Sequence, residues 1–491
     1  MPLAPRLSPP RRVASPHAAA ALAPLLLALC ACAALAPPLA APAAVEVPAA
    51  WSTSAQAAAA SATALAQWWS RFDDPLLAQL VSQALLANTD VASAQAALRQ
   101  ARALRDVAAA GLLPTLGSSA SAQRSRSNGN SASNSFRAGL DASWEPDIFG
   151  ANRSALDASE AVAHAREASL GDVQVSTAAE VALAYITLRS TQARLAIAND
   201  NLAGQQETLQ LTQWRVQAGL LSSLEGEQAR AAAEQTRAQL PALQSSIEQT
   251  AHALAVLTGR PPAALLEQLS EARPVPQAAG DLVLAIPAET LRQRPDVRAA
   301  EYQVTAALAR VAQADAARLP SFRLSGNLGL GALTLGALGS GAALASSILA
   351  SVSLPLFDGG AARAQVRAQH AALDGANVAY QAAVLTALKD VEDALVALRG
   401  DRERLARLRD AADAAANAAL LARQRYSSGL VDFQTVLETQ RTQRNAQDSV
   451  IAASADLSAD HVRMYKALGG GWSTDSGDAS AGPTASRTAK P

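Results

Sequence analysis

Two stretches of the chain alternate apolar and polar side chains with a period of two, the pattern of a β-strand with one apolar face. One stretch covers 136–145, and the other covers 322–330 and 348–356. The apolar positions are Phe136, Ala138, Leu140, Ala142 and Trp144 in the first, and Phe322, Leu324, Leu328, Leu330, Ile348, Ala350, Val352, Leu354 and Leu356 in the second. A small, polar run precedes the first stretch, so we predict one β-hairpin over 116–145 and another over 322–356.

Two proline-free segments of 68 residues, 151–218 and 361–428, follow the hairpins and are typical of very long helices. At about 1.5 Å per residue, each helix would be roughly 100 Å long. Apolar residues recur every seven positions, which is the spacing of a left-handed coiled coil. These positions are Val181, Leu188, Leu195, Leu202, Leu209 and Val216 in the first helix, and more weakly Val391, Leu398, Leu405, Ala412, Ala419 and Tyr426 in the second.

Each long helix is followed by a glycine-containing turn and a second helix. The turn at 219–221 leads into a return helix at 222–258, and the turn at 429–431 leads into a return helix at 432–468. The two turns lie 210 positions apart. This spacing indicates that one helical hairpin occurs twice.

The shorter helix before each hairpin is also duplicated. The segments 88–114 and 294–320 both carry Asp-Val near their start and end in Leu-Pro, which favours helices with an N-terminal Asp and a terminating Pro. We therefore predict a tandem repeat, with units at 75–259 and 288–469 joined by a proline-containing linker at 260–287.

The N-terminus has the composition of a secretory signal. Three arginines precede an apolar run at 18–36 that is too short and too interrupted by proline to span a membrane. We predict a signal peptide over 1–32, an extended lead-in over 33–74 and a disordered tail over 470–491.

The chain has two cysteines, Cys30 and Cys32, and both lie at the end of the apolar run. A bacterial lipoprotein signal ends in Leu, two small residues and the lipidated Cys. Residues 29–32 fit this pattern better than residues 27–30, so Cys32 is the predicted lipid attachment site and Cys30 the second choice. An ordinary signal peptide, cleaved after a small residue such as Ala40, is the alternative.

Charge and hydropathy narrow the class of protein. The formal net charge is -1, so no basic surplus points to a nucleic-acid partner. After the signal, no segment has 18 consecutive apolar residues, so a membrane crossing would have to be made by strands. Membrane barrels begin at eight strands, so four strands require oligomerisation: two, three or four copies would supply about eight, twelve or sixteen.

Three motifs, together with the repeat, resemble those of the TolC-type outer-membrane efflux factors. They are WEPDIFG at 144–150, LPLFDGG at 354–360 and YSSGLVDFQTVLETQR at 426–441. The resemblance covers about 68–469 and fits best the lipoprotein branch that includes NodT and OprM. In one departure, the Gly-Pro-x-Tyr usual after the lipidated cysteine is absent after Cys32.

The resemblance implies a mainly α fold with a transmembrane β-barrel, formed by a homotrimer whose strands build a twelve-stranded barrel and whose helices build a periplasmic tunnel. It implies a lipid-anchored protein of the outer membrane, with a periplasmic adaptor and an inner-membrane pump, often of the RND class, as partners. The predicted function is a passive conduit that carries small molecules from adaptor and pump to the exterior. The alternatives are the conduit of a type I protein secretion system and a non-transporting periplasmic coiled-coil scaffold, against which the apolar-faced hairpins argue.

In this family the ends of the helical hairpins form the periplasmic aperture and receive the adaptor. By this resemblance, the docking turns are Gly219, Leu220, Leu221, Gly429, Leu430 and Val431. The gate candidates are Arg215, Arg425, Tyr426 and Asp432. Charges near a narrow pore can hold helices together and discriminate ions. The same glycines also serve as plain helix caps, and the charges can equally be solvated helix ends.

The sequence carries no catalytic or metal-binding pattern. The histidines at 164, 252, 370 and 461 lack metal-ligand spacing. The glycine-rich run at 329–341 joins two strands and leads into no helix, unlike a dinucleotide-binding loop, and no nucleophile elbow, phosphate loop or zinc motif occurs. We predict neither enzyme activity nor a cofactor.

Overall fold

The computed structural model describes residues 47–52, 65–126, 132–278, 287–339 and 344–472. The two candidate lipid-attachment residues, Cys30 and Cys32, lie outside the described residues. The chain divides into two compact units. One is a sheet unit built mainly from Ala108–Leu156 and Leu308–Ala371, and the other is a helical unit built from Ala43–Val107, Asp157–Ala307 and Ala372–Pro491.

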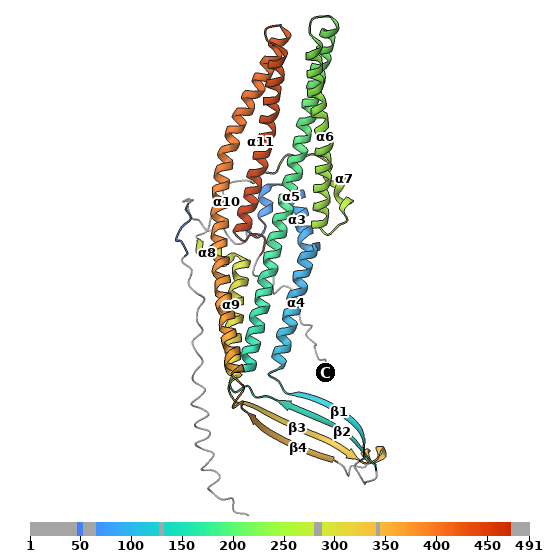
Figure 1. The fold of residues 1–491 in the computed structure, drawn as a ribbon, viewed down its shortest axis with the longest axis vertical. Helices are drawn as coiled ribbons and strands as arrows, with labels where there is room; N and C mark the ends of the chain where they lie inside the picture. The colour runs from blue at the N-terminus through green and yellow to red at the C-terminus, as the bar shows by residue number, and fades with distance from the viewer. Residues whose placement is uncertain (1–46, 53–64, 127–131, 279–286, 340–343, 473–491) are drawn as a thin grey trace, which may run out of the picture. The chain divides into compact units, whose positions relative to one another are not determined.

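Long helices make up most of the helical unit (Figure 1). Helices α5 (Ala151–Gln217) and α10 (Ala361–Ser427) have 67 residues each, and helices α6 (Ser223–Leu257) and α11 (Phe433–Ala467) have 35 each. The sequence placed these helices at 151–218, 361–428, 222–258 and 432–468, so each observed end falls within one residue of the expected one. In the part of the chain that the structure describes, no helix is both long enough and apolar enough to cross a membrane.

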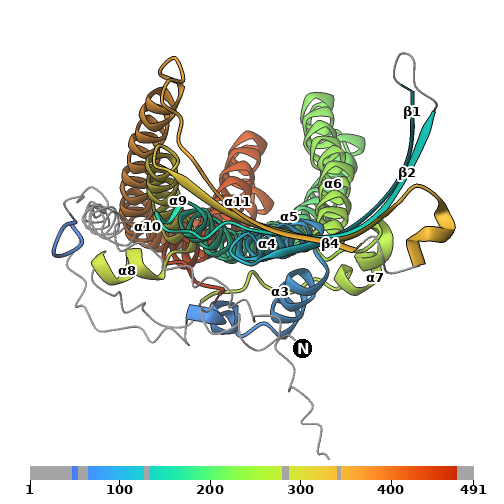
Figure 2. The ribbon, with the colours of Figure 1, turned by 90° about the horizontal axis from the view of Figure 1, so that it is seen from below.

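Shorter helices precede the strands. They are η2 (Trp68–Phe72), α3 (Pro75–Ala87), α4 (Thr89–Ala110), η3 (Pro262–Leu265), α7 (Leu266–Leu269), α8 (Pro287–Gln293) and α9 (Pro295–Ala316). Of these, α4 and α9 run beside the halves of α5 and α10 that are nearer the strands (Figure 1). Figure 2 shows α3, α7 and α8 on one side of the long helices. The helical pattern that begins at Pro75 is interrupted at Asn88, because its side chain accepts the Asp90 N–H at 2.8 Å and starts a new helix.

The segment before α3 belongs to the core, whereas the sequence suggested an extended lead-in over 33–74. Trp68 is fully buried and stacks on Tyr465 of α11, with 5.2 Å between the ring centroids. Asp74 caps α3 and also accepts a 2.7 Å hydrogen bond from the Tyr185 hydroxyl. Burial, together with this hydrogen bond, raises the pKa of Tyr185 to about 12. Large aromatic rings bury much apolar area, which is the physical reason that this segment is ordered.

The expected linker at 260–287 and the expected tail from 470 also contain packed residues. In the linker, α7 is tied to α5 by Gln192, which donates to the Leu269 carbonyl at 2.7 Å. In the tail, the Gly471 N–H donates to the Leu65 carbonyl at 3.0 Å. The Trp472 indole donates to the Gln293 carbonyl at 3.1 Å. The rest of the tail lies outside the described residues.

Each short helix meets the end of a return helix through an equivalent contact. Asn88, just before α4, donates from Nδ2 to the carbonyl of Leu257, the last residue of α6, at 3.0 Å. Arg294, just before α9, donates from Nη1 to the carbonyl of Ala467, the last residue of α11, at 2.9 Å. Helix α4 thus continues α6, and α9 continues α11.

The sheet unit has four antiparallel strands in the order β1-β2-β3-β4. They are β1 (Thr115–Ser125), β2 (Ser133–Trp144), β3 (Ser321–Ala332) and β4 (Leu344–Ser353), with a short η4 (Leu335–Gly339) in the second hairpin. Strand β4 ends at Ser353, so Leu354 and Leu356 do not belong to the strand expected to reach 356. Pro355 has no N–H to continue the ladder.

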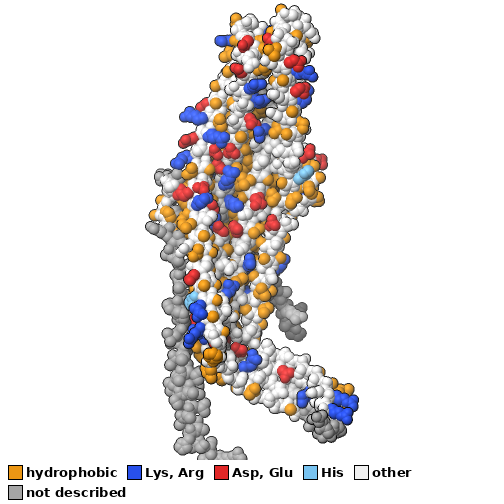
Figure 3. Space-filling view, in the orientation of Figure 1, with side chains coloured by type: hydrophobic (Ala, Val, Ile, Leu, Met, Phe, Trp, Pro, Cys, Tyr) orange, Lys and Arg blue, Asp and Glu red, His pale blue; other side chains and the backbone are white. Residues whose placement is uncertain are grey.

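The strand register makes one face of the sheet apolar across all four strands. Leu140 of β2 pairs with Leu328 of β3, and Trp144 pairs with Leu324, so apolar residues meet apolar residues. Eight exposed large apolar residues share this face: Leu116, Leu140, Trp144, Leu324, Leu328, Leu344, Ile348 and Val352. On the opposite face, Asp141 accepts a hydrogen bond from Ser119 at 2.8 Å. Figure 3 shows, by contrast, charged side chains of both signs spread along the helices.

Candidate functional site

The two helical hairpins end in turns with the same backbone geometry. Gly219 and Gly429 have φ angles of 70° and 76°, in the left-handed region. In the first turn, the Leu220 N–H donates to the Arg215 carbonyl at 2.8 Å, and the equivalent bond in the second turn is 2.9 Å. This is the Schellman arrangement, and it favours glycine because other residues are strained at such φ values.

Each turn presents a leucine to solvent. Leu220 and Leu430 follow the glycines, and the side chains of both are 73% exposed. Leu221 and Val431 come next and are half-buried. The end of each helical hairpin therefore exposes a small apolar surface on a rigid backbone.

Different side chains cap the two return helices. In the first hairpin, Ser222 and Glu225 form a capping box, in which the Ser222 N–H donates to the Glu225 carboxylate at 2.8 Å. In the second, Asp432 accepts the Thr435 N–H at 2.9 Å and the Thr435 hydroxyl at 2.6 Å. Hydrogen bonds from the Ser222 hydroxyl and, to a lesser extent, from its N–H lower the pKa of Glu225, and the bonds from Thr435 lower the pKa of Asp432. Both carboxylates therefore stay charged, and a negative charge at a helix N-terminus stabilises the helix.

The two hairpins are joined near their ends by an arginine and a tyrosine. The Arg215 guanidinium lies 4.8 Å from the centroid of the Tyr426 ring and donates to the Ser427 carbonyl at 3.4 Å. The other side of the contact is apolar: the Tyr426 ring lies 5.6 Å from that of Phe433, which is buried. Within the described residues, the buried Tyr426 hydroxyl has no hydrogen-bond partner.

The structure brings together two of the four gate candidates. Arg215 and Tyr426 are in contact, Asp432 is the cap of α11, and Arg425 is exposed and serves the turn through its backbone carbonyl. Phe433 was missed because one aromatic at a helix start carries no pattern.

The capping box of the first return helix was also missed. The spacing Ser222-x-x-Glu225 is a known signature of a helix start, so the sequence did carry a signal for it.

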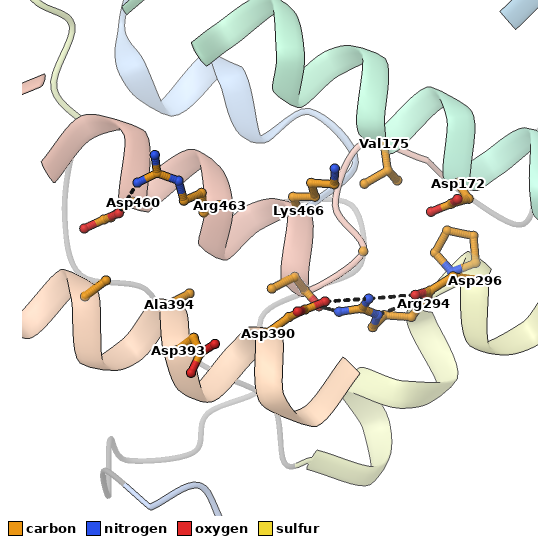
Figure 4. A pocket seen from close by; sticks show the side chains of 14 residues that line it. Asp172, Val175, Arg294, Asp296, Asp390, Asp393, Ala394, Asp460, Arg463 and Lys466 are labelled. Atoms are coloured by element: carbon orange, nitrogen blue, oxygen red, sulfur yellow. Dashed lines mark hydrogen bonds and ion pairs between the residues drawn. The ribbon is translucent and has the colours of Figure 1, made fainter. Parts of the chain in front are cut away.

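A second polar site is a cavity of about 440 Å³ between α5, α9, α10 and α11 (Figure 4). Its walls carry five aspartates and three basic residues: Asp172, Asp296, Asp390, Asp393, Asp460, Arg294, Arg463 and Lys466. Arg294 is buried and pairs with Asp296 at 2.7 Å and with Asp390 at 3.2 Å. The pairing joins the start of α9 to the middle of α10.

Two carboxyls of this cavity have raised pKa values. Burial raises the pKa of Asp172, and the nearby Asp296 raises it further. Burial also raises the pKa of Asp460, although Arg463 donates to it at 2.6 Å. Among the residues that the structure describes, no group of three or more His, Cys, Asp or Glu is placed to hold a metal ion.

Comparison with known proteins identifies the class. The family model described as outer membrane efflux protein matches residues 80–260 and 286–470, one match for each repeat. The chain belongs to this family. The resemblance to TolC-type efflux factors, inferred from the sequence motifs, is therefore confirmed.

Individual relatives are similar over nearly their whole length. Nodulation protein T of Rhizobium leguminosarum bv. viciae is 31% identical over 455 residues, covering 92% of this chain and 93% of that protein. The pyoverdine export outer membrane protein OpmQ of Pseudomonas putida is 35% identical over 474 residues, covering 93% and 98%. The solved structure of the outer-membrane channel OprN matches with a TM-score of 0.79 at 37% identity, covering 88% of this chain and 99% of that one.

Family membership defines the general activity and location. The protein is an efflux channel of the outer membrane, in a class that acts as passive conduits and not as enzymes. Its fold is mainly helical and matches that of outer-membrane channels.

Proposed function

We propose that three copies of this chain form the outer-membrane conduit of a tripartite efflux system, with a twelve-stranded transmembrane barrel and a periplasmic helical tunnel. One observation carries the proposal: all four strands share an apolar face, and β1 and β4 are the ends of the sheet. An open sheet edge is excluded from hydrocarbon, and four strands are too few to close a barrel. Pairing of β1 with β4 of the next copy satisfies both constraints.

The dimensions of the apolar face support this assignment. Phe136 and Trp144 mark its two limits on β2 and enclose nine residues, and a tilted transmembrane strand needs about 9–11 residues. Membrane barrels have an apolar band about 25 Å tall with aromatic residues at both interfaces. Asp141 and Asn327, which pair on the opposite face, would then line a polar interior.

Neighbouring residues on β4 allow a matched test. Ile348 lies on the apolar face and is 84% exposed, whereas Ser347 lies on the polar face. Ile348→Arg would place a cation in lipid at a cost of about 2–4 kcal/mol, and Ser347→Arg would place it in the aqueous lumen. We expect the first variant to reduce the amount of heat-stable oligomer in the outer membrane, and the second to leave it unchanged while altering conductance in planar bilayers. A water-soluble monomer without conductance would contradict the proposal.

The exposed turn leucines are the proposed contacts for a periplasmic adaptor. The two turns share one backbone geometry, and each exposes a leucine. They therefore suit an apolar contact with a helical partner that is repeated at both hairpins. A photo-crosslinking residue at Leu220 or Leu430 should capture the adaptor expressed with its pump in the same cells. A matched probe at Leu86, which is 87% exposed on α3, should not. Equal capture at all three positions would argue against specific docking.

The contact between Arg215 and Tyr426 is the proposed latch of the periplasmic gate, because it joins the ends of two different hairpins. Arg215→Ala should raise single-channel conductance. Arg230→Ala removes an exposed arginine that pairs within α6, and should not. A conductance increase in both variants would point to a general effect of surface charge instead.

We further propose that Cys32 carries a lipid, that the partner pump is of the RND class and that the cargo is small molecules. The OpmQ relatives are named for pyoverdine export and the TtgF relative for toluene efflux, which supports small cargo. Mass spectrometry of the mature N-terminus should show the lipid in Cys30→Ala but not in Cys32→Ala. The opposite result would move the anchor to Cys30.

A further inference from the structure

Uncompensated positive charge gathers at the turn end of the first hairpin of the sheet. Arg124, Arg126 and Arg137 lie there, and Figure 3 shows basic side chains at that end. The segments 115–136 and 321–357 contain no Asp or Glu. The nearest acid on β2 is Asp141. It lies four residues beyond Arg137, farther from the turn, which is roughly 13 Å along the strand.

The strand register separates these arginines by face. Arg124 pairs with Asn134 and lies two residues beyond Ala122, which pairs with Phe136 at the limit of the apolar face. Arg124 is therefore on the apolar face, just past its last apolar row. Arg126 follows directly after the strand and is exposed. Arg137 lies on the opposite, polar face.

We propose that Arg124 and Arg126 bind the phosphate groups of lipopolysaccharide in the outer leaflet, an inference that rests on the proposed barrel. The hairpin turns lie opposite the strand ends that connect to the helices, so in that barrel they face the exterior. Residues just past the apolar band reach the headgroup level. A guanidinium presents several donors in a planar fork that suits phosphate oxygens. No carboxylate of the turn region competes for the two arginines.

The second hairpin has the opposite character at its turn end. Leu333 and Leu335 are both 70% exposed there, and this turn has no charged residue. The phosphate-binding surface is therefore confined to the first hairpin, and a trimer would display it three times.

The test compares two arginine positions on opposite faces of one hairpin. The full-length protein in detergent is mixed with lipid A carrying two phosphates, with dephosphorylated lipid A, or with phosphatidylglycerol, and bound lipid is counted by native mass spectrometry. For wild type we expect binding of phosphorylated lipid A to be the tightest. The double variant Arg124→Gln/Arg126→Gln should bind it about tenfold more weakly, the loss of roughly one charge-assisted hydrogen bond. Arg137→Gln should bind within about twofold of wild type.

Other outcomes would overturn the inference. These are equal binding of dephosphorylated lipid A, equal binding of phosphatidylglycerol, or an equal loss in Arg137→Gln. The variant Arg124→Lys/Arg126→Lys keeps the charge but lacks the planar fork, so it should bind phosphorylated lipid A more weakly than wild type and more tightly than the double Gln variant. Binding by this variant as weak as that of the double Gln variant, despite intact oligomer, would also count against the inference. Conductance in planar bilayers is measured on the same samples. A conducting channel that shows no preference for phosphorylated lipid A would contradict this inference alone. Absence of conductance in wild type would contradict the proposed function.

Discussion

The two long helices have the same length but very different environments. In α5, 23 of 67 residues are buried, and in α10 only 8 of 67 are. Helix α10 instead exposes large apolar side chains along its length: Val378, Leu385, Val396, Leu420 and Leu421. The repeat thus reproduces a backbone but not its surroundings. Helix α5 is packed by its own chain, and the apolar residues of α10 are available to a neighbouring copy.

Positions 210 residues apart make this contrast specific. Ile186 of α5 is 2% exposed, and its counterpart Val396 of α10 is 51% exposed. Val175 is 3% exposed, and its counterpart Leu385 is 57% exposed. Each pair offers similar side chains on equivalent backbone in opposite environments.

The largest expected effect comes from truncating the buried member of such a pair. Ile186→Ala should lower the free energy of unfolding by about 2–5 kcal/mol, because it leaves a cavity in the core. Val396→Ala should change it by less than about 0.5 kcal/mol in the isolated chain. Thermal unfolding of the detergent-solubilised protein, followed by helical circular dichroism, measures the first effect.

The oligomeric state of Val396→Ala sharpens the comparison. If a neighbouring copy covers α10, this variant should dissociate at lower detergent concentration than wild type, as seen by light scattering. A variant that unfolds as early as Ile186→Ala would show that α10 is already packed within one chain.

The second expected effect concerns the glycines at the ends of the return helices. A Cβ at Gly259 would lie 2.4 Å from the Ala87 carbonyl oxygen, and one at Gly469 would lie 3.1 Å from the Cα of Arg294. At Gly219, in the exposed turn, a Cβ would meet nothing within 4 Å. We expect Gly259→Ala to cost about 3 kcal/mol, Gly469→Ala about 2 kcal/mol and Gly219→Ala about 1 kcal/mol, the last from backbone strain alone. Denaturant unfolding measures the free energy of unfolding of the three variants and so ranks them. Equal decreases in all three would show that steric clashes at the helix junctions contribute nothing.

A third effect separates the two helix junctions. Arg294→Met removes a buried guanidinium that bonds to Asp296, Asp390 and the Ala467 carbonyl, and should cost about 1.5–3 kcal/mol. Asn88→Ala removes a neutral cap at the equivalent junction and should cost about 1 kcal/mol. Only the arginine variant should show a smaller dependence of stability on salt than wild type, since Arg294 forms ion pairs with Asp296 and Asp390, whereas the described contacts of Asn88 are hydrogen bonds. Equal salt dependence in the two variants would contradict this assignment.

The smallest expected effect is a pH dependence that comes from Asp460 in the second repeat. Asp460 is buried, which raises its pKa above the ordinary 3.8, and its counterpart in the first repeat is Thr250. Well below pH 3.8, the ordinary value, the carboxyl is protonated in folded and unfolded states alike. As pH rises, the unfolded chain ionises first, so the folded state loses stability until the pH passes the folded pKa.

The variant Asp460→Asn tests this sign. Its melting temperature should converge on that of wild type below about pH 3 and exceed it by a few degrees at about pH 7. The exposed Asp413→Asn serves as the control and should show no such difference. A lower melting temperature of Asp460→Asn at neutral pH would mean that the ion pair with Arg463 outweighs burial.

The sequence predicted the helical hairpins closely because their signals are local. Proline-free heptad segments mark long helices, and glycines at 219 and 429 mark the turns that need a positive φ. The segments that the sequence misjudged also have a physical reason. The lead-in with Trp68 and the start of the tail with Trp472 have low-complexity surroundings, and only contacts with distant residues such as Tyr465 order them.

The candidate site was predictable in part for the same reason. The turn residues and Arg215 and Tyr426 stand next to glycine signals, so the sequence placed them at the hairpin ends. Their contact could not be predicted, because Arg215 and Tyr426 are 211 positions apart and meet only when two hairpins pack together.

By itself, the sequence determined the repeated unit: its helix lengths, its turns and the alternation within each strand, since all of these follow from neighbours along the chain. Only the tertiary structure decided how the strands align and which of the two long helices is buried. Alternation says that a strand has an apolar side, but the pairing of Leu140 with Leu328 puts the apolar sides of β2 and β3 on one face. A register shift of one residue would have mixed the faces, because side chains alternate with a period of two.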